Sequence, residues 1–169
     1  MNNDMNLPFF PDSAPFSEQQ QAWLAGSKAG MAAMEQSAAA ATQRVAPELN
    51  ILFGTQTGNS ELLAEAAAVR ARSTGFEPKV MAMDDVSMDA LAAMRQAIVV
   101  VSTYGEGEMP DNAELFWDAL SASTAPRLES LNFGVLALGD TGYDDFCQAG
   151  KLIDTRFEQL GAKRVLARI

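Results

Sequence analysis

The sequence predicts an α/β fold built on a parallel β-sheet with helices on its faces. Three observations lead to this prediction. The chain has 169 residues and is 48% hydrophobic, which is enough for one ordinary domain with a substantial core. From Leu49 onward, short apolar runs alternate regularly with helical stretches. The runs are nearly continuous Val, Ile and Leu, which is typical of parallel strands that are buried on both faces and joined by right-handed crossovers.

The predicted elements alternate between strand and helix, beginning and ending with a strand. In chain order they cover residues 51–53, 60–72, 79–83, 88–94, 97–103, 112–122, 133–139, 147–160 and 165–169. Ligands of such sheets bind at the carboxyl ends of the strands, near the point where the strand order reverses. The loops that follow the first, third and fourth strands therefore form the candidate site.

The first 48 residues are predicted to be an extension with one helix and a linker. Ser17, with a glutamine three positions later, has the pattern of a capping box at a helix start. The helix would carry an apolar side made of Trp23, Leu24, Met31 and Met34. The alanine run 38–41 and Pro47 indicate the linker. We therefore expect a second domain over residues 49–169.

The composition excludes several classes of function. The formal net charge is −10, which disfavours nucleic acid and anionic membranes as partners and favours basic proteins. The chain has no histidine, which excludes imidazole general-base chemistry and a Ser-His-Asp triad. Its single cysteine, Cys147, cannot form an internal disulfide, as is usual in a reducing compartment. With no secretory signal or membrane-spanning run recognisable, we expect a cytoplasmic protein.

The first loop, "GTQTGNS" (54–60), is rich in hydroxyls and amides and contains no lysine. The missing lysine excludes a P-loop, and the glycine spacing excludes a dinucleotide fingerprint. Free backbone N–H groups at a helix N-terminus, beside the hydroxyls of Thr55, Thr57 and Ser60, suit one small phosphate dianion. The alternative is an ordinary polar turn that caps a helix, and this loop alone does not decide between the two.

The second and third loops, "STYGEGEMPDN" (102–112) and "LGDTGYDDFCQAG" (138–150), each place a tyrosine after a strand end. Tyr104 and Tyr143 are the two tyrosines of the chain, and rings on neighbouring loops can enclose a planar heterocycle. Either loop, taken alone, could be an ordinary glycine-rich turn. Together with the first loop, they favour a flat, phosphorylated cofactor.

The segments "LFGTQTGN", "STYGEGEMPDNAELFW" and "LGDTGYDDFCQAGK" resemble the FMN-binding, flavodoxin-like domain of NADPH-dependent diflavin reductases. The last segment is most similar to the flavoprotein component of assimilatory NADPH-sulfite reductases, and "APFSEQQQAWLAGSKAGM" resembles the segment that precedes the FMN domain there. The resemblance covers residues 49–169. It implies a flavodoxin-like three-layer sandwich whose five-stranded parallel sheet has the order 2-1-3-4-5.

The resemblance also implies which residues contact the cofactor, FMN. The phosphate would be held by Thr55, Gln56, Thr57, Gly58 and Asn59. One side of the flavin ring would be wrapped by Ser102, Thr103, Tyr104, Gly105, Glu106 and Gly107. The other side would be lined by Leu138, Gly139, Asp140, Tyr143, Phe146 and Cys147. Tyr143 is the expected main stacking residue, and Cys147 is expected to be a small wall residue without a redox role. We expect no catalytic side chain and no metal ligand.

The function implied by the resemblance is electron transfer. Electrons would pass from NADPH through FAD to FMN, and then to a partner that contains haem or an iron–sulfur centre. The FAD/NADPH-binding reductase domain, the electron donor, is expected on a continuation of the chain. The chain would then be a component of an oxidoreductase, and whether it counts as an enzyme stays open. The alternatives are a free-standing electron carrier of flavodoxin type and a truncated fragment that binds no flavin.

The sequence also predicts an acidic surface around the site and an incompletely covered sheet. The predicted site is surrounded by acidic residues, which would either steer a basic partner or form a plain solvated face. They are Glu106, Glu108, Asp111, Glu114, Asp118, Asp140, Asp144 and Asp145. The closing helix that the family places after the fifth strand is missing, so we expect one face of the sheet to be partly uncovered. The N-terminal helix could cover that face or bind a neighbouring subunit in an oligomer.

Overall fold

The computed structural model describes residues 17–18 and 46–169. The part Ala46–Ile169 forms one compact unit. The predicted N-terminal helix, its apolar side and the oligomer contact through it lie outside the described residues, except for Ser17 and Glu18 at the start of that helix.

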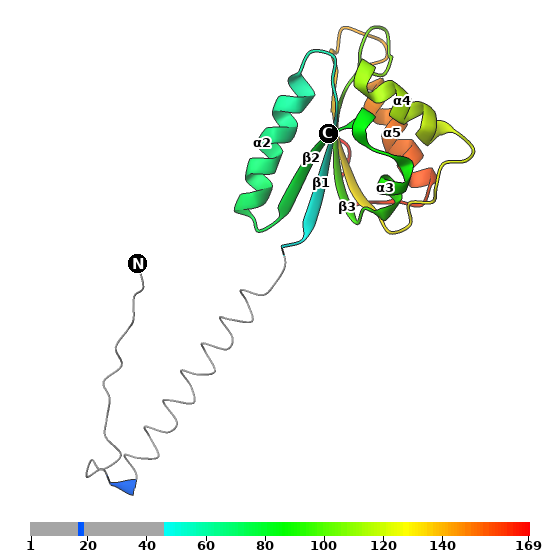
Figure 1. The fold of residues 1–169 in the computed structure, drawn as a ribbon. Coiled ribbons are helices and arrows are strands. Elements are labelled where there is room, and N and C mark those ends of the chain that lie inside the picture. The colour runs from blue at the N-terminus through cyan, green and yellow to red at the C-terminus, as the bar shows by residue number, and fades with distance from the viewer. Residues whose placement is uncertain (1–16, 19–45) are drawn as a thin grey trace. The chain divides into compact units, whose positions relative to one another are not determined.

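Five parallel strands form a single sheet in the order β2-β1-β3-β4-β5 (Figure 1). This confirms the predicted order and the flavodoxin-like sandwich. The first four strands begin and end within a few residues of their predicted bounds. The strands are β1 (Glu48–Gly54), β2 (Glu77–Ala82), β3 (Gln96–Ser102), β4 (Asn132–Leu138) and β5 (Lys163–Arg164).

The helices lie in two layers, one on each side of the sheet (Figure 1). One face carries α2 (Asn59–Ser73), and the other carries α3 (Met88–Ala93), α4 (Asp111–Ser121) and α5 (Gln148–Gln159). A short 3₁₀ helix, η1 (Met83–Asp85), follows β2.

The central strands are apolar along their length because both of their faces are buried. On the side of α4 and α5, a large core contains Leu52, Val99 and Phe133, all fully buried. On the side of α2, a smaller core joins Ile51 and Val100 to two alanines of that helix. Successive strand residues point to opposite faces, so an uninterrupted apolar run supplies both cores.

Gly150 allows α5 to pack closely against β4. A Cβ at this position would overlap with the Cβ of Ala137 and lie 3.6 Å from Cγ1 of Val101. Because the Ala137 Cβ cannot rotate away, we expect Gly150→Ala to lower the free energy of unfolding by about 1–3 kcal/mol. Urea denaturation measures the change, with Gly142→Ala in an exposed loop as the control. Equal losses in the two variants would contradict this packing.

The fifth strand differs from its prediction. It was expected over residues 165–169, whereas the structure places it at Lys163–Arg164. The Val165 amide donates to the Phe133 carbonyl of β4 at 2.9 Å, but the next bond, to the Val135 carbonyl, comes from Ile169 at 3.1 Å. A regular parallel ladder advances two residues at a time. Two extra residues therefore leave the sheet between these bonds, so the apolar pattern of 165–169 is not that of a continuous strand.

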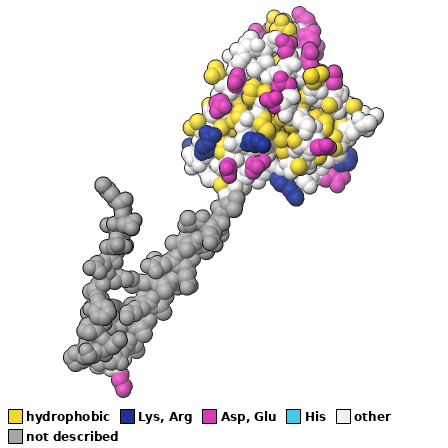
Figure 2. Space-filling model, viewed as in Figure 1, with side chains coloured by type: hydrophobic (Ala, Val, Ile, Leu, Met, Phe, Trp, Pro, Cys, Tyr) yellow, Lys and Arg dark blue, Asp and Glu magenta, His cyan; other side chains and the backbone are white. Residues whose placement is uncertain are grey.

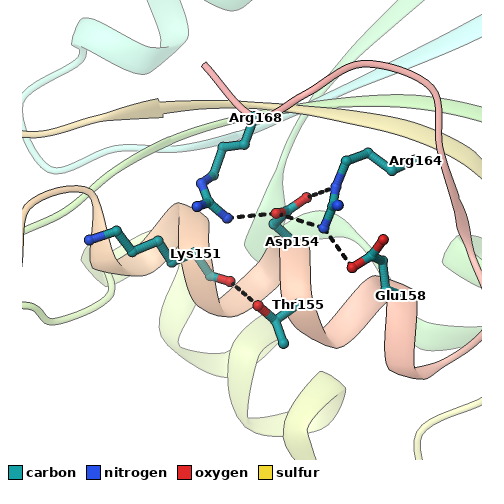
Figure 3. A network of polar contacts seen from close by, with 6 residues as sticks. All are labelled: Lys151, Asp154, Thr155, Glu158, Arg164 and Arg168. Carbon is teal, nitrogen blue, oxygen red and sulfur yellow. Dashed lines mark hydrogen bonds and ion pairs between the residues drawn. The ribbon is translucent and has the colours of Figure 1, made fainter.

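Asp154 of α5 holds this irregular edge in place (Figure 3). Its carboxylate is buried and accepts hydrogen bonds from Arg164 at 2.7 and 2.9 Å and from Arg168 at 2.6 Å. Arg164 also pairs with Glu158 at 2.7 Å. Arg168 belongs to the segment that leaves the ladder, and its contact with Asp154 gives a physical reason for the interruption of the strand.

The face of the sheet that carries α2 is partly uncovered beside β3 and β4. A hollow of about 400 Å³ lies there, and Val165 and Leu166 at its border are 54% and 62% exposed. Figure 2 shows hydrophobic side chains at the surface on this side of the domain. Within the described residues, no helix follows β5. The hollow is lined by Leu49, Phe76, Gln96, Ala97, Ile98, Asn132, Gly134, Val165 and Leu166.

Candidate functional site

The three predicted loops meet at the carboxyl edge of the sheet, at the top of the view in Figure 1. They follow β1, β3 and β4, which are neighbours in the sheet. The site has two parts: a polar loop at the start of α2, and a hollow between the loops that follow β3 and β4.

The hollow has a volume of about 310 Å³ and is lined by residues from both loops. Tyr104 and Tyr143 are 51% and 49% exposed, and Phe146 is 39% exposed, so all three rings are accessible. Such an arrangement of aromatic side chains suits a flat ligand. The lining residues are Thr103, Tyr104, Gly105, Gly139, Asp140, Tyr143, Asp145, Phe146 and Cys147. Asp145 was not among the predicted contacts.

Several predicted contact residues lie elsewhere. The Ser102 hydroxyl donates to the Gly54 carbonyl at 3.4 Å, and Leu138 packs on the α2 side of the sheet. Glu106 is exposed on the loop after β3. Gly107 borders a second hollow of about 430 Å³ that Trp117 and nearby carboxylates also line. The lining of the first hollow thus contains eight of the twelve residues predicted for the flavin ring.

The backbone around the first hollow is held by hydrogen bonds within the loops. Tyr104 and Glu108 exchange backbone hydrogen bonds at 3.0 and 2.8 Å, which closes a tight turn. The Thr103 hydroxyl accepts from the Ala149 amide at 3.1 Å, so it caps the start of α5. In the third loop, the Asp140 carboxylate accepts from the Gly142 amide at 2.8 Å. The tyrosine side chains are therefore carried by ordered turns.

Cys147 forms part of the wall of this hollow. Its thiol is buried and donates to the Ala137 carbonyl at 3.4 Å. Burial raises the pKa of the thiol, while Lys151 and Arg168 oppose this effect. A thiol with a raised pKa carries little thiolate near neutral pH, so it is a poor nucleophile.

The loop at the start of α2 has the features of an anion site. Gly58, with φ of 89°, is the N-cap residue, and no side chain caps the helix. The Thr55 hydroxyl accepts from the Gly58 amide at 2.9 Å. The Ser60 hydroxyl is fully buried and has no hydrogen-bond partner. A buried hydroxyl without a partner is costly, and one at an uncapped helix N-terminus suits an incoming anion.

The sequence predicts the Ser60 hydroxyl beside the phosphate, but its complete burial and its lack of a hydrogen-bond partner are visible only in the structure. Sequence reasoning also missed the hydrogen bonds from the first loop to Asp111 and Asn112 at the start of α4. The only sign of these bonds in the sequence is that the second loop ends in two polar residues, Asp111 and Asn112.

The surroundings of the site are acidic. Figure 2 shows acidic side chains at the top of the domain, over the loops that follow the strands. Among the described residues, no group of three or more His, Cys, Asp or Glu could hold a metal ion. None of the helices in the described ranges is long and apolar enough to cross a membrane.

The sheet is open and parallel, and it carries an anion loop after its first strand beside a hollow with accessible tyrosines. This combination defines a class of proteins that bind a flat phosphorylated cofactor. The family model described as "Flavodoxin" matches residues 51–169, and the chain belongs to the flavodoxin family. FMN is the cofactor of the flavodoxin domain. The unpartnered Ser60 hydroxyl, the uncapped helix and the aromatic hollow fit this molecule.

Curated relatives are sulfite reductase [NADPH] flavoprotein alpha-components. The protein from Bacillus subtilis is 40% identical over 98% of this chain and 30% of its own length. The protein from Vibrio parahaemolyticus is 40% identical over 90% of this chain and 26% of its own length. The chain therefore spans less than a third of these relatives.

Solved structures of flavodoxins are also similar. A flavodoxin from Pseudomonas aeruginosa has a TM-score of 0.64 and 32% identity, and the match covers 72% of this chain and 81% of the flavodoxin. Oxidised flavodoxin 1 from Bacillus cereus has a TM-score of 0.65 and 25% identity, with 72% and 82% covered.

Proposed function

We propose that this chain is the FMN-carrying electron-transfer module of a flavoprotein of the NADPH-sulfite reductase type. The observation that carries the proposal is the 40% identity to the Bacillus subtilis flavoprotein over 98% of the chain, together with an FMN-type site. In this proposal the donor is an FAD/NADPH-binding reductase domain, and the acceptor is a partner with haem or an iron–sulfur centre. The buried, unpaired thiol of Cys147 is consistent with a cytoplasmic location.

The two parts of the site would hold different parts of FMN. The first loop and Ser60 would bind the phosphate through neutral donors, and Tyr104 and Tyr143 would border the ring, with Tyr143 as the main stacking residue. Bound FMN supplies one- and two-electron redox chemistry. The residues of the chain bind and orient the cofactor, and a partner would approach the ring beside Tyr104 and Tyr143, which are about half exposed.

The acidic residues around the hollow favour a basic partner surface. Within the hollow itself, Asp140 and Asp145 contribute carboxylates, and Glu108 and Asp118 border the neighbouring hollow. Clustered charge of one sign accelerates encounter with a partner of opposite sign.

Electron transfer from the FMN-loaded chain to a basic acceptor is therefore expected to slow as salt is added. Raising the ionic strength from about 0.01 M to about 0.15 M shortens the Debye length from about 30 Å to about 8 Å. Stopped-flow reduction of the basic probe cytochrome c measures the second-order rate constant, which we expect to fall at least about tenfold. A rate constant that does not depend on salt would exclude steering by these carboxylates.

Reconstitution tests the proposed function. The FMN-loaded chain is mixed anaerobically with NADPH, the FAD/NADPH-binding part of the Bacillus subtilis relative and a sulfite reductase that contains haem. We expect NADPH-dependent reduction of the haem only when the chain is present. A chain that loads FMN but takes no electrons from the FAD part would contradict the proposal.

A free-standing electron carrier is the second candidate, because the chain also matches 81% of a solved flavodoxin at 32% identity. The two candidates differ in where the donor lies. Genomic sequence that continues this reading frame into an FAD/NADPH-binding domain would favour the module, and a stop codon followed by an unrelated gene would favour the carrier.

A further inference from the structure

The first loop is joined to the start of α4 by three hydrogen bonds that span more than fifty residues of sequence. The Thr55 amide donates to Oδ1 of Asn112 at 2.7 Å. Nε2 of Gln56 donates to Oδ2 of Asp111 at 2.8 Å. The Asp111 amide donates to Oε1 of Gln56 at 3.0 Å. We refer to these three bonds as the loop–α4 contacts.

The loop–α4 contacts use groups that could otherwise face a ligand. Both polar atoms of the Gln56 amide are engaged with Asp111, so this side chain is committed to holding the loop. The Thr55 amide is likewise committed to Asn112. The part of the loop that stays available lies further along, at Thr57, Asn59 and the unpartnered hydroxyl of Ser60.

The loop–α4 contacts continue into the anion site itself. Thr55, held by Asn112 through its amide, accepts from the Gly58 amide through its hydroxyl at 2.9 Å. Gly58 is the N-cap residue of α2, and Ser60 lies in the first turn of that helix. On the other side, Ser102 of β3 donates to the Gly54 carbonyl at 3.4 Å. The loop is thus bonded to β3 at Gly54 and to α4 at Thr55 and Gln56, and Thr55 is bonded in turn to the N-cap residue of α2.

We propose that Asp111 and Asn112 are positioning residues that hold the first loop in the conformation that accepts a phosphate monoester, and so give the site its preference for FMN over unphosphorylated flavin. This inference rests on the proposed FMN site. A loop that is fixed before binding loses less conformational entropy when the ligand arrives. None of the four residues that make the loop–α4 contacts lines the hollow for the ring, whose lining comes from residues 103–105 and 139–147. Loss of the loop–α4 contacts is therefore expected to weaken binding of the phosphate and to leave binding of the flavin ring unchanged.

Titration of the full chain with two flavins tests the proposal. Apoprotein is titrated with FMN and with riboflavin, which lacks the phosphate, and binding is followed by quenching of flavin fluorescence. Asn112→Ala leaves the Thr55 amide without its acceptor, and we expect it to weaken FMN about tenfold. Riboflavin affinity is expected to change less than about twofold, because riboflavin makes no phosphate contact.

Two further variants separate positioning from charge. Asp111→Asn retains an oxygen that accepts from Gln56, so it is expected to keep the wild-type ratio of FMN to riboflavin affinity, whereas Asp111→Ala lowers that ratio. Glu114→Ala removes an exposed carboxylate one helical turn later and serves as the matched control. In a double-mutant cycle, Gln56→Ala and Asp111→Ala should be non-additive, because each removes the same side-chain contact.

The outcomes are distinguishable. Equal weakening of both flavins by Asn112→Ala, or an unchanged FMN affinity, overturns the positioning role. Should Asn112→Ala fail to fold, the exposed pair Gln56 and Asp111 decides, since both side chains can be replaced without opening the core. A wild-type chain that binds neither flavin defeats the FMN site itself, whereas FMN binding with unchanged ratios in the variants defeats this proposal alone.

Discussion

Asp154→Ala is expected to lower the free energy of unfolding by about 3 kcal/mol, because it leaves the guanidinium groups of Arg164 and Arg168 without their shared carboxylate. The Asp154 side chain is 3% exposed, so its charge is desolvated and fully committed to these two partners. The arginine side chains are 30% and 33% exposed. They can regain part of their hydration, which places the effect at the lower end of the range for breaking a buried pair.

Chemical denaturation of the full chain measures this loss. Glu158→Ala is the matched control, because Glu158 pairs with Arg164 from a side chain that is 48% exposed. A surface pair of this kind contributes less than about 1 kcal/mol. If the two substitutions had equally small effects, Asp154 would not be what fastens the edge of the sheet to α5.

Ser60→Ala is expected to separate binding from stability. We expect it to weaken FMN at least about tenfold, because hydrogen bonds to a charged phosphate contribute about 1.5–3 kcal/mol. In the apoprotein the same change removes a buried hydroxyl that has no partner. The free energy of unfolding should therefore stay unchanged or rise by about 1 kcal/mol.

Flavin titration and urea denaturation of the same preparations check both halves of this prediction. Ser73→Ala is the control at the opposite end of α2, where the Ser73 hydroxyl donates to the Arg70 carbonyl at 2.7 Å. It should leave the FMN affinity unchanged. A Ser60→Ala chain that binds FMN as tightly as the wild type would show that the hydroxyl does not face the phosphate.

Most of the fold could be predicted from local patterns. The buried strands β1, β3 and β4 appear in the sequence as unbroken apolar runs because each is covered on both faces. The fifth strand could not be predicted in the same way. Its residues Val165–Ile169 are apolar enough for a strand, but Arg168 donates a hydrogen bond to Asp154. A pattern of apolar residues along the sequence cannot predict this long-range contact.

The sequence predicts which loops form the candidate site, but it does not predict the hydrogen bonds that their side chains make. The positions of Tyr104 and Tyr143 after strand ends placed them in one hollow. The hydroxyls of Ser102 and Thr103 are instead used to hold β1 and α5, because backbone groups of those elements lie within reach. The partners of the first loop, Asp111 and Asn112, come from α4, and only tertiary structure brings them there.

We expect this chain to bind FMN at the loops that follow β1, β3 and β4. The most direct measurement is a titration of the purified apoprotein with FMN, followed by visible absorbance of the protein fraction after removal of free flavin. We predict saturation at one FMN per chain and retention of the flavin absorbance with the protein. An apoprotein that retains no FMN at micromolar concentrations near neutral pH would exclude FMN binding at these loops.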